Sequence, residues 1–189
     1  QLVVLITSYV LWAFSLPVAF SILTILMLRM ALHKLPHENM AASSWLALGP
    51  IGTGALGMLL LGSDAPAIFA ANGLPGIGEI AAGLGLIAGI TLWGFGLWWM
   101  LMALLITARY LRDGIPFNLG WWGFTFPLGV YSLATLKLAS TLNLGFFSVV
   151  GCVLVSLLAV MWLIVGKRTV QGAWRGELFV SPCIAGLKK

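Results

Sequence analysis

Five long runs without a charged side chain constrain this sequence more than any other feature. A helix needs roughly 20 mostly apolar residues to cross the hydrocarbon core of a bilayer, and every run is longer than that. Charged residues make up 8% of the 189-residue chain, against about 25% in a typical soluble domain. We therefore expect an all-α, polytopic membrane protein with five transmembrane helices. The uncharged runs are residues 1–28, 39–63, 80–108, 114–136 and 138–166.

Basic residues between the runs predict the orientation, because cytoplasmic loops collect Lys and Arg. Nine of the ten follow the first, third or fifth run, and these positions share one side if the helices alternate in direction. We expect a multi-pass protein of the cell (inner) membrane, with that side and the tail 167–189 in the cytoplasm. The expected helices cover approximately residues 2–28, 42–62, 79–108, 118–137 and 145–166.

The second and fourth runs share a pattern around a proline. The second reads W-L-A-L-G-P-I-G from Trp45 and the fourth reads W-G-F-T-F-P-L-G from Trp122, at an offset of 77 residues. Repeats of this kind are common in transporters and predict two helical hairpins of one design. Proline removes a helical hydrogen bond, which is tolerated where protein or a watery cavity surrounds the helix. We expect these two helices to be the inner ones, although prolines are also simply commoner in membrane helices. In the third run, Gly85-x-x-x-Gly89 predicts a close approach of another helix.

Enzymatic and metal chemistry have little support in the sequence. His33, His37 and Glu38 form the only arrangement that resembles a metal site, and Pro36 interrupts the helical spacing that such a site requires. The basic residues do not alternate with aromatic residues along a stripe, as a nucleic-acid face requires. We expect no catalytic residue, metal or cofactor, and no nucleic-acid partner.

The spans lack the mid-membrane Asp or Glu that proton relays and cation sites usually contain. An uncharged pore suits a permeant that must not be held tightly. Threonine hydroxyls, a phenylalanine constriction and backbone opened near the two prolines would line it. The candidate pore residues are Gly49, Pro50, Gly52, Thr53, Phe124, Thr125, Phe126 and Pro127, with Thr135 as a further hydroxyl donor.

Lys137, the tenth basic residue, stands apart at the outer end of the fourth run. Its ammonium group either extends to the membrane interface or places a positive charge at the mouth of a pore, where it raises the local concentration of anions.

Three segments carry a family resemblance. Residues 121–129 read W-W-G-F-T-F-P-L-G and continue to S-L-A-T at 132–135, while 48–52 read L-G-P-I-G and 172–179 read G-A-W-R-G-E-L-F. The first segment resembles the ninth helix of the tellurite-resistance/C4-dicarboxylate transporter family. That family includes the plant slow-type anion channels.

The resemblance implies ten helices in five hairpins around a central pore, with odd-numbered helices inside. This chain would supply the C-terminal half, helices six to ten, and would need the N-terminal helices of the same protein as partners. It also implies homotrimers, membrane lipid as a partner, and transport of small anions such as malate, sulfite, tellurite-related or inorganic anions. A phenylalanine that plugs the pore maps to Phe126. The alternative is a structural membrane subunit that transports nothing and uses its glycines and prolines only for packing.

Overall fold

A computed structural model describes residues 1–33, 41–176 and 178, and this part of the chain contains helices and connections without a strand. The elements are α1 (Leu2–Leu32), α2 (Ser43–Leu46), α3 (Leu48–Ala70), α4 (Pro75–Asp113), the 3₁₀ helix η2 (Leu119–Phe124), α5 (Thr125–Leu142) and α6 (Gly145–Arg175). The expected all-α class is therefore confirmed for the described residues.

The helices are longer than the uncharged runs predict. The segment 63–78, expected to lie largely outside the helices, is helical except for the turn at 71–74. Helix α6 continues to Arg175, so the beginning of the expected tail is helical too. Hydropathy marks only the membrane part of a helix, whereas the helix itself continues until a residue leaves the helical conformation. It stops here near Gly73 and Gly176, whose φ angles of +77° and +72° favour glycine.

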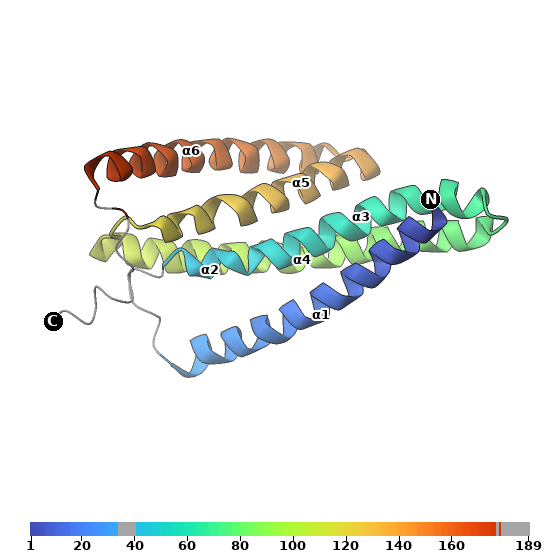
Figure 1. Cartoon of the computed structure of the whole chain (residues 1–189), viewed down its shortest axis with the longest axis horizontal. Helices are drawn as coiled ribbons and strands as arrows, with labels where there is room; N and C mark the ends of the chain where they lie inside the picture. Colours follow the sequence, from blue (N-terminus) through green and yellow to red (C-terminus); the bar gives the residue numbers. More distant parts are fainter. Residues whose placement is uncertain (34–40, 177, 179–189) are drawn as a thin grey trace.

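Two antiparallel hairpins and one flanking helix make up the molecule. Helices α3 and α4 form the first hairpin, and α5 and α6 form the second, which turns at Asn143 in the left-handed conformation (φ 52°). Figure 1 shows α6, α5, α3 and α1 in that order across the view, with α4 alongside α3. The pairing matches the two hairpins that the repeated proline pattern predicts.

Within the part of the chain that the structure describes, four helical segments are long and apolar enough to cross a membrane, namely 2–32, 43–70, 75–112 and 145–175. Helix α5, with 18 residues, does not reach the same hydropathy because it carries serines, threonines and Lys137. Half of the 43–70 span (50%) is buried, against 11% of α1, 22% of α4 and 17% of α6. Along α5, the buried residues include polar Ser132 and Thr135. Helices α3 and α5 are thus the inner helices, as their prolines led us to expect.

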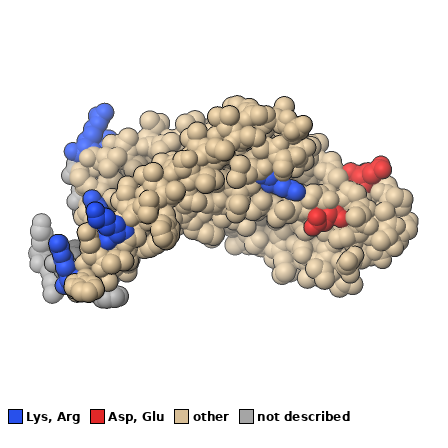
Figure 2. Space-filling view, turned by 90° about the horizontal axis from the view of Figure 1, so that it is seen from above, with Lys and Arg blue, Asp and Glu red and all other residues tan. Residues whose placement is uncertain are grey.

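Charged residues separate along the long axis. Arg29 lies in the last turn of α1, Arg112 in the last turn of α4 and Arg175 in the last turn of α6. On the face shown in Figure 2, Lys and Arg gather mainly at this end of the molecule, and Asp and Glu lie toward the other end. The helices therefore alternate in direction as the distribution of basic residues predicts.

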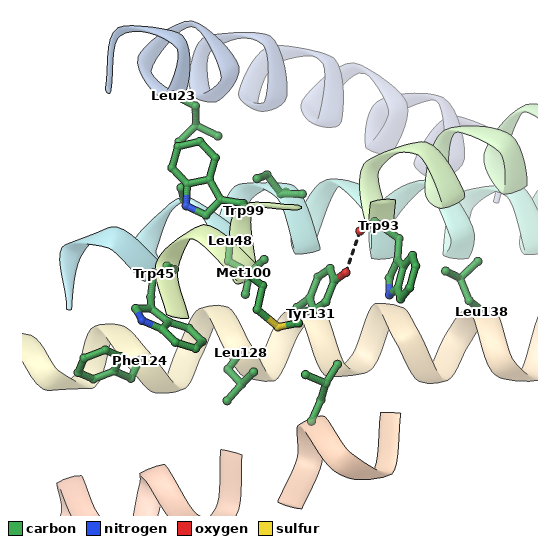
Figure 3. Packing of buried hydrophobic residues seen from close by; sticks show 14 of the residues in the cluster. Leu23, Trp45, Leu48, Trp93, Trp99, Met100, Phe124, Leu128, Tyr131 and Leu138 are labelled. Atoms are coloured by element: carbon green, nitrogen blue, oxygen red, sulfur yellow. Dashed lines mark hydrogen bonds between the residues drawn. The ribbon is translucent and has the colours of Figure 1, made fainter. Parts of the chain in front are cut away.

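Tryptophans from α2 and α4 form the centre of the core around Tyr131 of α5 (Figure 3). Each indole N–H has a partner: Trp93 donates to Oγ1 of Thr135 (2.8 Å), and Trp45 donates to Oγ1 of Thr107 (2.9 Å). Tyr131 donates its hydroxyl proton to the carbonyl oxygen of Trp93 at 2.7 Å. Buried aromatic side chains with polar groups need such partners, so these hydrogen bonds determine how α4 sits against α2 and α5.

Small residues line the contact within the first hairpin. A methyl group added at Gly85 would lie 2.8 Å from the Cα atom of Gly62, and one at Gly89 would lie 2.6 Å from the side chain of Leu59. The predicted close approach at Gly85-x-x-x-Gly89 is therefore the contact between α4 and α3.

Candidate functional site

Each inner helix begins two residues before the proline of the repeated pattern. At Ala47, whose dihedral angles are helical (φ −61°, ψ −30°), α2 passes into α3, which starts at Leu48, so that Pro50 is its third residue. The 3₁₀ helix η2 leads into α5, where Pro127 is again the third residue. Proline has no N–H group to donate to the preceding helical turn, so the regular α-helical hydrogen-bond pattern restarts just before each proline. The backbone itself stays helical across both breaks, at Ala47 and at Phe124, so Pro50 and Pro127 lie inside helical segments.

Helices α3 and α5 touch through the glycine that follows Pro50. A Cβ atom built on Gly52 would lie only 3.0 Å from the backbone nitrogen of Tyr131 and 3.2 Å from its Cα. Backbone atoms cannot turn aside as a flexible side chain can, so the two inner helices approach this closely only with glycine at position 52.

Phe126 covers the other glycine of this pattern. The ring is 64% exposed, and its Cε1 atom would lie 3.3 Å from a Cβ atom at Gly49. Helix α5 therefore presents Phe126 on its surface, across the start of α3, and Gly49 leaves room for the ring. Phe126 is one of the largest apolar side chains that α5 exposes.

A continuous strip of exposed residues runs along both inner helices, and we call it the open face. It contains Thr53 and Leu60 of α3, which lie seven residues apart, and Phe126 and Leu133 of α5, with the same spacing. Residues seven apart share one face of a helix. Helix α4 packs on a different face of α3, through Leu59 and Gly62.

Helices α1 and α6 flank the open face. Trp12 of α1 donates its indole proton to the carbonyl oxygen of Gly54 (3.2 Å), and the side chain of Leu158 of α6 lies 3.5 Å from a Cβ built on Gly129 of α5. Among the described residues, none covers Phe126, Leu60 or Leu133, which all remain largely exposed. The open face thus lies between α1 and α6.

The only ammonium group near the open face, within the described residues, belongs to Lys137. Its Nζ atom lies 3.3 Å from Oγ of Ser63 on α3, and this hydroxyl lies 3.4 Å from Oδ1 of Asp64. At a rise of 1.5 Å per residue, Lys137 stands about 16 Å from Phe126 along α5. The positive charge of Lys137 and the apolar ring of Phe126 therefore lie at two different depths along the open face.

The remaining predicted pore residues have other surroundings. Phe124 is 3% exposed, and its ring packs edge-on against Trp45 and Trp121, with centroids 5.7 Å apart in both pairs. Thr125 is buried and donates to the carbonyl oxygen of Trp122. Pro127 and Thr135 are buried as well, and Pro50 faces a groove beside α1. Of the predicted set, only Thr53 and Phe126 belong to the open face, and Gly49 is buried beneath the ring of Phe126.

Sequence reasoning missed Leu60, Ser63 and Leu133. The signal was present, because Leu60 follows Thr53 by seven residues and Leu133 follows Phe126 by seven. No group of three or more His, Cys, Asp or Glu residues close enough to hold a metal occurs in the described part of the chain. His37 and Glu38 of the histidine arrangement considered above lie outside the described residues.

Comparison with known proteins identifies the family of this chain. Residues 1–170 match the model of a family described as SLAC1, voltage-dependent anion channel. The chain belongs to the SLAC1 family. The resemblance inferred from the W-W-G-F-T-F-P segment is thereby confirmed, because that family of transporters and slow-type anion channels is the one matched.

Curated relatives of this SLAC1-family chain come from fungi and archaea. A protein named sulfite efflux pump SSU1 from Arthroderma otae is 38% identical over 94% of the chain and 47% of its own length. A sulfite efflux pump SSU1 from Trichophyton rubrum is 36% identical over the same shares. The uncharacterized transporter MJ0762 of Methanocaldococcus jannaschii is 31% identical over 95% of the chain and 49% of its own length. The chain spans about half the length of these relatives. No solved structure matches it.

Proposed function

We propose that this chain forms half of a membrane pore for a small oxoanion such as sulfite, and that the open face lines the pore. The observation that carries the proposal is that the two most enclosed helices, α3 and α5, leave one shared strip uncovered. In this proposal α5 is the fifth span, shielded from lipid by its neighbours, which is why it tolerates more polar residues. The other half of the pore would come from helices that the longer relatives possess.

The side chains of the open face suit an anion. Among the described residues of α3 and α5, the only carboxylate is that of Asp64, near the outer end of α3. Lys137 adds a positive charge that raises the local concentration of anions, whereas the hydroxyl of Thr53 donates its proton to the carbonyl oxygen of Gly49 (2.8 Å). The relatives' names favour sulfite over a dicarboxylate such as malate, and they also favour transport over a purely structural membrane subunit.

Phe126 is the proposed gate. A hydrophobic constriction closes a pore by excluding water and requires no charge. The Phe126 ring stands on the open face at the start of α5, and glycine at position 49 lets it lie against the start of α3. The buried ring of Phe124, two residues earlier, serves packing in this proposal.

The test is sulfite flux into proteoliposomes that contain the full-length protein. We expect Phe126→Ala to raise the flux above that of wild type while the yield of folded protein stays near normal. Phe124→Ala is the matched control: loss of a buried phenylalanine typically costs about 3–5 kcal/mol of stability, so its yield and flux should both fall. A well-folded Phe126→Ala protein with no more flux than wild type would rule out the gate.

A further inference from the structure

A groove outside the open face lies between the second half of α1 and the elements that follow it. It has a volume of about 420 Å³, within the range of roughly 300–1,000 Å³ that ligand cavities usually have. The α1 wall consists of Ala19, Ile22, Leu26 and Met30, which share one helical face. Across from it lie Ala47 and Pro50 at the start of α3, and α4 closes the back. The walls are almost entirely apolar.

The groove has the length of one lipid leaflet. From Ala19 to Met30 the α1 wall rises through eleven residues, or about 16 Å. The hydrocarbon core of a bilayer is about 30 Å thick, so one leaflet contributes about half of that. The groove thus runs from the end of α1 to about the middle of the membrane.

Arg29 is the only charged side chain among the described residues that line the groove. Arg29 lines it in the last turn of α1, at the end of the molecule where the other basic residues gather (Figure 2). That end would lie at the level of the lipid headgroups if the apolar part of α1 spans the hydrocarbon core. A cation at headgroup level above an apolar channel of leaflet length is complementary to a phospholipid with an anionic headgroup.

We propose that this groove binds one acyl chain of an anionic phospholipid, with the lipid phosphate paired to Arg29. Basic residues attract anionic lipid at a membrane surface, and the apolar walls of the groove provide contacts for the acyl chain. The site requires that the chain sits in a bilayer, and it stands whether or not Phe126 gates a pore.

Native mass spectrometry of the intact protein, released from nanodiscs that contain equal amounts of phosphatidylglycerol and phosphatidylcholine, tests the site. We expect phosphatidylglycerol to be retained about fivefold more than phosphatidylcholine, as for one basic residue near an anionic headgroup. Arg29→Gln should remove this preference, while Ala19→Trp should fill the groove and lower the retention of both lipids. Arg175→Gln is the matched control, since Arg175 is exposed at the same end of the molecule without lining the groove.

Each result decides for or against the proposal. Equal retention of the two lipids by wild type would overturn it, and so would an equal loss in Arg29→Gln and Arg175→Gln. Unchanged lipid retention in a folded Ala19→Trp protein would show that the groove holds something else, either another copy or another helix of the protein. Sulfite flux measured on the same variants keeps this outcome separate from a failure of the proposed pore.

Discussion

Lys137 and Ser63 meet on the open face although 74 residues separate them in the chain. We predict that Lys137→Gln in the full-length protein lowers anion flux, and lowers it more at low ionic strength than at high. The reason is that salt screens an exposed charge, with a Debye length of about 30 Å at 0.01 M and about 8 Å at 0.15 M. The measurement is initial sulfite flux into proteoliposomes at two salt concentrations.

Lys167→Gln supplies the control for this prediction. Lys167 is exposed on α6, at the other end of the molecule from Asp64 and Glu79. The same removal of charge there should leave the salt dependence of influx from the outer side unchanged. If Lys137→Gln conducts like wild type at both salt concentrations, its ammonium group only extends to the membrane interface.

At the scale of elements, the α3–α4 hairpin depends on glycines that face the partner helix. We predict that Gly85→Ala lowers stability by about 1–3 kcal/mol, the usual range for overpacking. A methyl group at Gly85 would lie 2.6 Å from the carbonyl oxygen of Met58 and 2.8 Å from the Cα of Gly62. Both are backbone atoms, so the helices must separate to admit it. Thermal unfolding in detergent, followed by circular dichroism, measures the effect.

Gly83, two residues earlier on the same helix, is the matched control. No atom lies within 4 Å of a Cβ atom built there. Alanine has a higher helix propensity than glycine, so Gly83→Ala should leave the unfolding temperature unchanged or raise it. A similar loss of stability in both variants would mean that the glycines act through flexibility instead of close packing.

At the scale of the whole molecule, the separation of charge predicts a topology. We expect Arg112 to face the cytoplasm and the turn at Asn72 to face outside, because Lys and Arg collect on the cytoplasmic side. Single cysteines at these two positions, in a protein whose Cys152 and Cys183 are replaced by serine, should react with a membrane-impermeant maleimide from opposite sides of intact cells. Labelling of both from the same side would contradict alternating spans.

The class of the protein and its hairpins follow from local features of the amino-acid sequence. Hydropathy and the placement of Lys and Arg are local properties, so five runs, their directions and the repeated proline pattern can be read without any contact. The inner position of α3 and α5 also followed, because irregular backbone at membrane depth needs protein or water around it. The helix ends did not follow, since α3, α4 and α6 continue beyond their uncharged parts.

Which side chains belong to the open face depends on contacts between helices and could not be read from the sequence. Phe124 and Phe126 have the same chemistry and stand two residues apart, yet one is 3% and the other 64% exposed. A membrane helix that is apolar on every face has no amphipathic signal to orient it. Its rotation is determined instead by contacts distant in sequence, such as the backbone of Tyr131 against Gly52 and the indole of Trp45 against Phe124. These packing contacts, which no local pattern encodes, turn Phe126 outward and Phe124 into the core.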